Sequence, residues 1–331
     1  MRVTGPSAPQ GRADYAYITS LGHSGSTLLE LILGNLPRMV NVGELERLSL
    51  QLARGRRGKR PGLCSCRKRP VDCPVWGAVI EAVRREYGVS LTEDPFGWQL
   101  SNIGREHEGK WRTPLSVLAR QWYSLCRLAK YYDLPLLKHL SGLSLVHRRW
   151  VDHRFFVAAV VKRVTGAETV IDASKNAVGM RDVYDYGPGL VKIIFLTRDV
   201  HGVVWSEVKR LKGRRDVVHF ARRWVNENRR IARFLQGIPR EDWIHVKYEA
   251  LCADPADTIR RLCGFLGHAY DPAMAAGPFG GENAHTIYGN TIRFSKIEAI
   301  KEDLSWKQQL TPEEIAEVDR IAGPMMKQLG Y

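Results

Sequence analysis

A strand pattern, a glycine- and serine-rich turn and a helix pattern follow one another near the N-terminus, and this succession constrains the fold most. Residues 15–20 have the pattern of a buried strand, and residues 27–36 that of an apolar helix that Pro37 ends. Glycines let the backbone curl so that successive N–H groups point inward, and a helix N-terminus adds the positive end of its dipole. The turn therefore predicts an anion-binding loop. Its candidate binding residues are Gly22, His23, Ser24, Gly25, Ser26 and Thr27.

Two other interpretations of this turn are open. It would serve equally as a turn that only caps the helix. A kinase or NTPase loop would carry the pattern GxxxxGK[ST], with a lysine for the β- and γ-phosphates and an aspartate elsewhere for magnesium. The loop contains no lysine, which counts against phosphoryl transfer. The aspartates that follow or end apolar strand patterns are Asp172 and Asp199.

Strand and helix patterns alternate along the rest of the chain. Further strand patterns occur at residues 40–42, 168–171, 191–196 and 244–246, and the last three each precede a helix-like segment. Such alternation is typical of a parallel sheet covered on both faces. We predict an α/β protein with a P-loop-like three-layer fold, a central parallel sheet and a helical insertion. The expected organisation is a flexible tail at 1–13 and one domain at 14–331, with the insertion at about 74–166.

The chain carries a net charge of +15 over 331 residues, which favours a polyanionic partner. A nucleic acid, an anionic membrane surface and a nucleotide with several phosphates would all satisfy this charge. We expect no nucleic-acid partner, because no binding motif for one is recognised. The first residues are polar and the apolar runs are shorter than a membrane span. We therefore expect a cytoplasmic protein without a transmembrane segment.

Three of the six cysteines lie close together in the sequence. Cys64, Cys66 and Cys73 form a CxC pattern followed by a third cysteine and Pro74. They would supply three ligands of a zinc site, but no fourth ligand is evident from the spacing, and structural zinc takes four. Reduced thiols in a tight turn are the alternative. We expect no metal to be required.

A second candidate phosphate-binding group follows the strand pattern at 191–196. Arg198 ends this segment, and Ser206 lies eight residues further on, in the next helix pattern. This spacing lets a guanidinium fork and a hydroxyl reach one phosphate. The alternative for Arg198 is an ion pair with Asp199 or another neighbour.

Taken together, these segments resemble the PAPS-dependent sulfotransferases, where PAPS is 3'-phosphoadenosine 5'-phosphosulfate, and in particular the bacterial, carbohydrate-type and tyrosylprotein-type members. The loop GHSGSTLL is similar to the family's 5'-phosphosulfate loop, and LTRDVHGVVWS to its 3'-phosphate motif RDPxxxxxS. His23 stands where relatives carry lysine or arginine, and Val200 replaces the proline of the second motif.

Further motifs follow in the order that the family shows. Residues 171–176 resemble a DxSK stretch, and residues 246–251 resemble YEdL, whose tyrosine, here Tyr248, borders the adenine. Residues 289–294 and the later Trp306 resemble the ending GNPxRF…W, although Thr291 replaces its proline. The resemblance adds Asn290 and Arg293 to the nucleotide-binding residues.

The resemblance implies sulfuryl transfer from PAPS to a hydroxyl of a carbohydrate, phenol, lipid or natural product, with 3'-phosphoadenosine 5'-phosphate as product. Glu44 follows Gly43 and matches the family's GE, whose glutamate is the base; Glu46 is the second candidate. The alternative interpretation of Glu44 is that it caps a helix. His23 and Lys175 are the groups expected to neutralise charge on the bridging oxygen.

The acceptor is expected to be a small molecule or a glycan, selected by the aromatic-rich insertion. Two other functions are open from the sequence. One is a P-loop nucleotide kinase or NTPase, and the other is a basic nucleotide-binding protein without catalysis.

Overall fold

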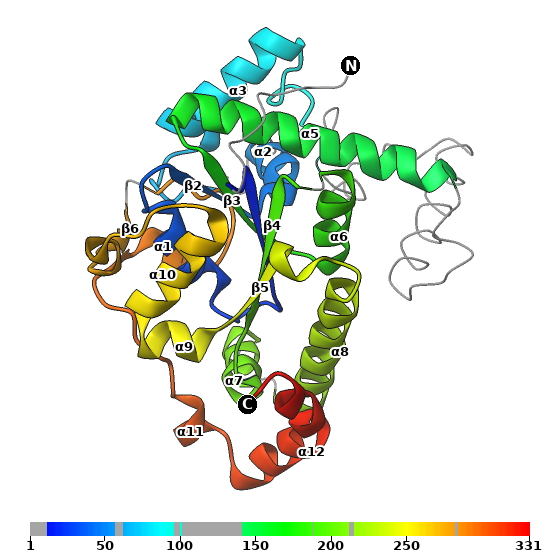
Figure 1. Cartoon of the computed structure of the whole chain (residues 1–331), viewed down its shortest axis with the longest axis vertical. Coiled ribbons are helices and arrows are strands. Elements are labelled where there is room, and N and C mark those ends of the chain that lie inside the picture. The colour runs from blue at the N-terminus through cyan, green and yellow to red at the C-terminus, as the bar shows by residue number, and fades with distance from the viewer. Residues whose placement is uncertain are drawn as a thin grey trace.

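A five-stranded sheet forms the centre of the molecule (Figure 1). The computed structural model describes residues 12–56, 62–95, 100, 141–187, 189–211, 215–281 and 284–331. All neighbouring strands of the sheet are parallel, in the order β2-β3-β1-β4-β5. The strands are β1 (Tyr15–Thr19), β2 (Met39–Gly43), β3 (Thr169–Lys175), β4 (Val191–Thr197) and β5 (Trp243–Lys247). The predicted α/β class with a central parallel sheet is confirmed.

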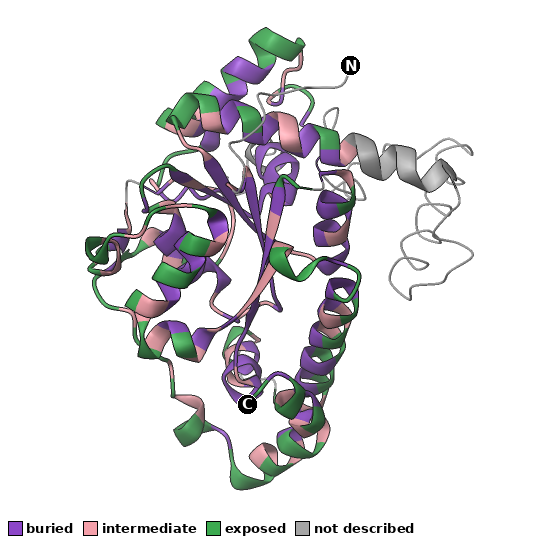
Figure 2. Ribbon diagram, in the orientation of Figure 1, coloured by how far each residue is buried: buried purple, intermediate pink, exposed green. Residues whose placement is uncertain are grey.

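Successive residues of each inner strand face two different cores. Along β1, Tyr15 and Tyr17 belong to one buried cluster, while Ala16 and Ile18 belong to the other. Every residue of β1 is buried, which is the pattern of a strand covered on both faces. The sheet is therefore the middle of three layers, and its inner strands are largely purple in Figure 2, while the edge strand β5 is mostly intermediate.

Helices cover the two faces of the sheet (Figure 1). One face carries α1 (Ser26–Gly34), α9 (Tyr248–Ala253) and α10 (Pro255–Leu266). The other face carries α5 (Ser141–Thr165), α6 (Ala177–Tyr186), α7 (Val200–Arg210), α8 (Val217–Leu235) and α12 (Pro312–Gln328). Helix α3 (Pro74–Tyr87) packs beside α5.

The shorter elements lie at the edges of these layers. They are η1 (Leu45–Arg47), α2 (Leu48–Arg56), η2 (Pro70–Asp72), η4 (Arg240–Asp242), η5 (Pro272–Ala275), β6 (Phe279–Gly280), η7 (Thr291–Phe294), β7 (Lys296–Ile297) and α11 (Trp306–Gln309). Strands β6 and β7 form a small antiparallel pair. None of the helices in the described ranges combines the length and the hydropathy that a membrane crossing demands.

Two predicted boundaries are wrong, one by four residues and the other by two. The strand expected at 168–171 runs on to Lys175, because Asp172 still pairs with Gly43 of β2 and Lys175 with Thr19 of β1. Helix α1 ends at Gly34 instead of residue 36, since Asn35 already caps it.

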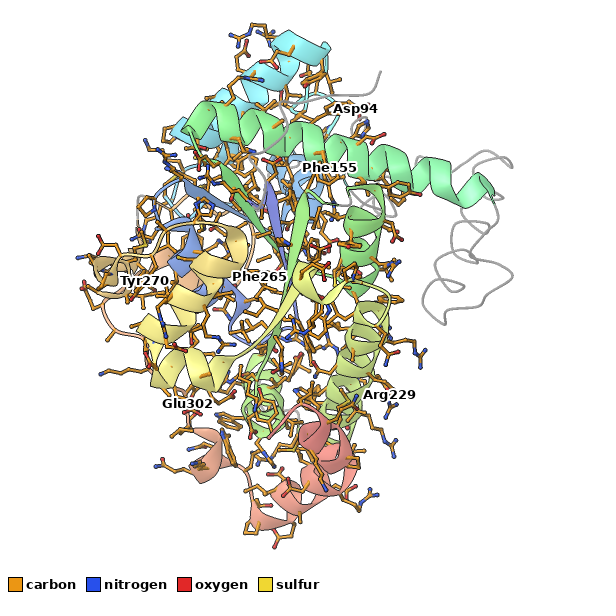
Figure 3. All side chains as sticks on the ribbon, viewed as in Figure 1. Asp94, Phe155, Arg229, Phe265, Tyr270 and Glu302 are labelled. Carbon is orange, nitrogen blue, oxygen red and sulfur yellow. The ribbon has the colours of Figure 1, made fainter. Side chains whose placement is uncertain are left out.

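The predicted helical insertion is described only in part. Helices α3 and α5 lie within it, and the aromatic residues between them fall outside the described residues, namely Trp98, Trp111, Trp122, Tyr123, Tyr131 and Tyr132. Phe155 of α5, labelled in Figure 3, packs edge-to-face on Tyr15 with ring centroids 5.5 Å apart. This partly buried aromatic residue therefore packs against the core.

Candidate active site

The carboxyl ends of all five strands deliver candidate site residues to one edge of the sheet. The glycine loop follows β1, Glu44 follows β2, Lys175 ends β3, Arg198 follows β4 and Tyr248 follows β5. The strand order places β1 between β3 and β4, so β2 and β3 lie on one side of β1, and β4 and β5 lie on the other. Ligands of open α/β sheets bind at such a switch point.

The loop has the backbone shape of an anion cradle. Gly25, the N-cap of α1, has φ of 90°, and a Cβ atom there would lie 2.5 Å from the Tyr248 ring. Both the left-handed conformation and the close approach therefore need glycine. No side chain caps the first turn of α1 at this residue. The hydroxyl-bearing residues Ser24, Ser26 and Thr27 are buried around it.

Arg198 contacts both the glycine loop and Ser206, the other residue of the predicted 3'-phosphate site. Its Nη1 donates to the backbone carbonyl of His23 at 3.2 Å and to Ser206 Oγ at 3.5 Å. The guanidinium lies over the Tyr248 ring, 4.6 Å from its centroid. The glycine loop, the arginine–serine pair and the tyrosine thus meet in one place.

The acidic partner of Arg198 is Asp303. Its Oδ2 is 3.7 Å from Arg198 Nη2 and 3.2 Å from Lys209 Nζ. The ion pair with Asp199 left open by the sequence is wrong, because Asp199 accepts from the backbone and the ring of His201. Asp303 is 105 residues from Arg198, and no local pattern reveals such a contact.

Glu44 is held between two cations. Its Oε1 accepts from Lys175 Nζ at 2.6 Å, and its Oε2 accepts from Arg47 Nε at 2.6 Å. The residue is only 7% exposed. Glu44 precedes η1 but makes no side-chain cap to it, so the helix-cap interpretation is wrong. Lys175 has φ of 67°, a rare conformation for lysine that aims its side chain from the last position of β3.

Glu46, the second candidate base, belongs to a buried ion pair. Arg154 Nη2 donates to its Oε2 at 2.9 Å, and both side chains are almost fully buried. Burial raises the pKa of Glu46, and the charge of Arg154 opposes that rise. This residue ties η1 to α5 in the interior.

Asp172 also has a structural position. Its Oδ1 accepts from the backbone of Ser174 at 2.9 Å and of Leu45 at 3.4 Å, and its Oδ2 accepts from the Tyr15 hydroxyl. Burial raises its pKa, and Arg154 opposes that rise. A carboxylate with these contacts shapes the turn after β2 and β3.

His23 is half-buried at the mouth of the loop. Burial lowers the pKa of its imidazole, and Glu207, whose Oε2 lies 3.9 Å from Nε2, opposes this shift. The charges of Arg210, Lys175 and Arg223 lower the pKa further. In the protein without a bound anion, His23 is therefore easier to deprotonate than an ordinary histidine.

The segment with Asn290 and Arg293 lies against the loop. The Asn290 N–H faces Thr27 Oγ1 at 3.3 Å, and its side chain caps η7. Arg293 donates to the carbonyl oxygens of Gly289, at 2.5 Å, and Leu63, at 3.4 Å. The side chains of Asn290 and Arg293 thus stabilise the conformation of this segment by hydrogen bonds to backbone atoms.

Glu30 is a buried acid that the sequence did not single out. It lies on α1, and neither carboxyl oxygen has a hydrogen-bond partner among the described residues. Burial raises its pKa well above the usual range, and Lys175 opposes this shift. The sequence feature that could have revealed Glu30 is a glutamate inside an apolar helix pattern.

Residues 188–272 match the model of the sulfotransferase family. This segment contains Arg198, Ser206 and Tyr248. The chain carries a sulfotransferase-family region. The resemblance predicted from the motifs is supported by this match, which covers 85 of the 331 residues. No curated protein sequence matches the chain.

Solved sulfotransferase structures align with nearly the whole chain. A sulfotransferase domain from the curacin biosynthetic pathway is 16% identical, with a TM-score of 0.47, over 95% of this chain and 97% of that one. A sulfotransferase domain from the Synechococcus PCC 7002 olefin synthase is 19% identical, with a TM-score of 0.48, over 96% and 98%. The sulfotransferase STF9 from Mycobacterium avium is 11% identical, with a TM-score of 0.45, over 97% and 77%.

Proposed function

We propose that the protein transfers the sulfuryl group of PAPS to a hydroxyl acceptor. The observation that supports this most directly is the contact between Arg198 and the His23 carbonyl at 3.2 Å. It brings a candidate 3'-phosphate site and a candidate 5'-phosphosulfate loop within the span of one nucleotide. The match to the sulfotransferase family supports the reaction class.

The donor's charged groups have complementary partners on the chain. The N–H groups and hydroxyls of residues 22–27 suit the 5'-phosphosulfate. Arg198 and Ser206 suit the 3'-phosphate, because a guanidinium fork binds phosphate oxygens in pairs. The Tyr248 ring, packed on Gly25 and under Arg198, suits the adenine.

Glu44 is the proposed base, because its carboxylate stands at the sheet edge while Glu46 is paired in the interior with Arg154. The acceptor oxygen forms a bond to sulfur as the bond from sulfur to the phosphate oxygen breaks. The acceptor proton passes to Glu44, and the electron pair stays on the leaving phosphate. Lys175 and a protonated His23 stabilise the charge that develops there.

Of the two alternative functions, the kinase or NTPase fits the site less well. A kinase or NTPase would need a loop lysine and an aspartate free to hold magnesium, but Asp172 is buried and Asp199 caps α7. A nucleotide-binding protein without catalysis would bind the same nucleotide and transfer nothing.

Titration calorimetry with 3'-phosphoadenosine 5'-phosphate and with ATP tests the donor. We expect the first to bind at least tenfold more tightly, because ATP lacks the 3'-phosphate that Arg198 would bind. Incubation with radiolabelled PAPS and a panel of phenols, sugars, lipids and natural products then tests transfer. Tighter binding of ATP with magnesium-dependent hydrolysis would favour the kinase or NTPase. Binding without transfer to any acceptor would favour the non-catalytic protein.

A further inference from the structure

A cluster of three thiols and one imidazole lies outside the proposed active site. The thiols are those of Cys64, Cys66 and Cys73, and the imidazole belongs to His285, which is 212 residues beyond Cys73. All four potential ligand atoms lie within 4.8 Å of one another. The fold thus supplies the fourth ligand that the spacing of the cysteines did not reveal.

Three of the distances in the cluster are close to those between ligands of a tetrahedral metal. Cys73 Sγ lies 3.6 Å from Cys64 Sγ and 3.3 Å from His285 Nδ1, and Cys64 Sγ lies 3.9 Å from the same Nδ1. Zn–S bonds of about 2.3 Å and Zn–N bonds of about 2.0 Å put such ligand atoms about 3.5–3.8 Å apart. A disulfide would need sulfur atoms about 2.05 Å apart.

We propose that Cys64, Cys66, Cys73 and His285 bind one structural Zn²⁺ ion. Three thiolates and one imidazole are a donor set that zinc prefers. Because the protein fills all four positions of a tetrahedron, no position is left for water or substrate, which is typical of a structural site.

Neighbouring groups hold these ligands in place. The Trp76 N–H donates to Cys73 Sγ at 3.5 Å, and its indole Nε1 donates to the His285 carbonyl at 2.5 Å. The backbone N–H of Cys66 donates to the Cys64 thiol. Hydrogen bonds of this kind orient metal ligands and spread the charge of thiolates.

The two ligand-bearing segments are also joined directly to each other. The Ser65 N–H donates to the Thr286 carbonyl at 3.0 Å, and the Thr286 N–H donates to Ser65 Oγ at 2.9 Å. Ser65 Oγ in turn donates to the Ala284 carbonyl at 2.5 Å. These hydrogen bonds hold the segment that carries Cys64 and Cys66 beside the segment that carries His285.

Charge around the cluster suits a zinc–thiolate centre. Three thiolates and one Zn²⁺ leave one negative charge. The turn after Cys66 carries Arg67, Lys68 and Arg69, and Arg67 adopts a φ of 64° that folds the chain back so that Cys64 N–H reaches the Lys68 carbonyl at 2.9 Å. Arg69 is paired with Asp72, so Arg67 and Lys68 supply the basic charge that offsets that of the centre.

The site would anchor a segment that reaches the catalytic edge of the sheet. The Tyr288 carbonyl packs 2.7 Å from the position of a Cβ at Gly43, directly before Glu44. Asn290 N–H contacts Thr27 of the loop. Zinc bound by His285, three residues before Tyr288 and five before Asn290, would stabilise the segment at residues 284–290. The inference concerns the metal alone and stands whether or not the proposed transferase activity is correct.

Metal analysis of the purified full-length chain tests the proposal. The protein is isolated under reducing conditions from zinc-supplemented cells. Inductively coupled plasma mass spectrometry should then find one zinc ion per chain. Replacement of zinc by Co²⁺ should give the d–d and thiolate charge-transfer absorption of a tetrahedral S₃N site. Modification of the cysteine thiols should release that one equivalent of zinc.

Variants show whether the metal lies in this cluster. Cys66→Ser and His285→Ala should lose most of the zinc, while His285→Cys should keep it, because a fourth thiolate restores the ligand set. Cys263→Ser is the matched control, since Cys263 is a buried cysteine of α10 outside the cluster. Its zinc content should equal that of the wild type.

A measurement on the wild-type protein tests the site even if the variants do not fold. A strong chelator should lower the Tm by several degrees, and added Zn²⁺ should restore it. Zinc that is absent both on isolation and after addition of Zn²⁺ to the reduced protein would overturn the proposal. So would a Cys64–Cys73 disulfide in the native protein, or full zinc content in both Cys66→Ser and His285→Ala.

Discussion

At the scale of single residues, the guanidinium of Arg198 bridges the two halves of the proposed donor site. Arg198→Ala should raise the KM for PAPS about 10- to 100-fold, because a hydrogen bond to a charged group contributes about 1.5–3 kcal/mol. Initial rates over a range of PAPS concentrations measure this change. Arg229→Ala, on the exposed side of α8 (Figure 3), is the matched control and should leave the KM unchanged. An unchanged KM in Arg198→Ala would remove this residue from the site.

The two candidate bases should respond differently to removal of their charge. Glu44→Gln should lower kcat by about 10²- to 10⁴-fold and leave the binding of 3'-phosphoadenosine 5'-phosphate intact, because the amide cannot accept the acceptor proton. Glu46→Gln should instead destabilise the protein by about 3–5 kcal/mol, because it leaves the buried charge of Arg154 uncompensated. Steady-state kinetics and thermal unfolding of both variants measure these effects. Full activity in Glu44→Gln would move the role of base to another residue.

His23 gives the site a pH dependence that arginine would not. The proposed role needs the protonated imidazole, and burial lowers its pKa from the ordinary value. The value of kcat/KM for PAPS should therefore fall as pH rises through this lowered pKa, on the acid side of neutrality. His23→Arg should remove this fall, and a pH profile of the variant that matches the wild type would contradict the assignment.

At the scale of the connecting segments, the turn before α11 places an acidic group beside Arg198. Asp303 Oδ2 lies 3.7 Å from the guanidinium, where it competes with a phosphate for the same cation. Asp303→Asn keeps the Oδ1 that accepts from Ser305 N–H and removes the charge. The affinity for 3'-phosphoadenosine 5'-phosphate should rise about 3- to 10-fold at low salt and less at high salt. Weaker binding in calorimetry would mean that Asp303 orients Arg198 instead.

The elements that the sequence predicted best are those whose signal is local. The strand, loop and helix around residues 15–34 are visible because apolar runs and glycines lie next to one another in the chain. The end of β3 was missed because Asp172 and Ser174 are polar residues typical of loops, and the pairing of Asp172 with Gly43 and of Lys175 with Thr19 exists only in the fold. Asp303 and His285 reach their partners only through the fold. A set of three cysteines without a fourth ligand was nevertheless a signal to search the ten histidines.

At the scale of the whole molecule, one ligand should stabilise the entire sheet, because every strand contributes to the proposed site. A ligand at 100 times its Kd adds about 2.7 kcal/mol to the free energy of unfolding. Saturating 3'-phosphoadenosine 5'-phosphate should therefore raise the Tm by about 5 °C, measured by calorimetry or circular dichroism.

The predicted rise in Tm needs a control, because a chain with a net charge of +15 would attract any polyanion. Inorganic sulfate at equal ionic strength and heparin test the general attraction, and ATP tests recognition of the adenosine without the 3'-phosphate. A specific donor site predicts the largest shift with 3'-phosphoadenosine 5'-phosphate and the loss of most of that shift in Arg198→Ala. Equal shifts with heparin, or a shift that survives in Arg198→Ala, would mean that the basic surface binds the anions and that the loop and the arginine do not share one nucleotide.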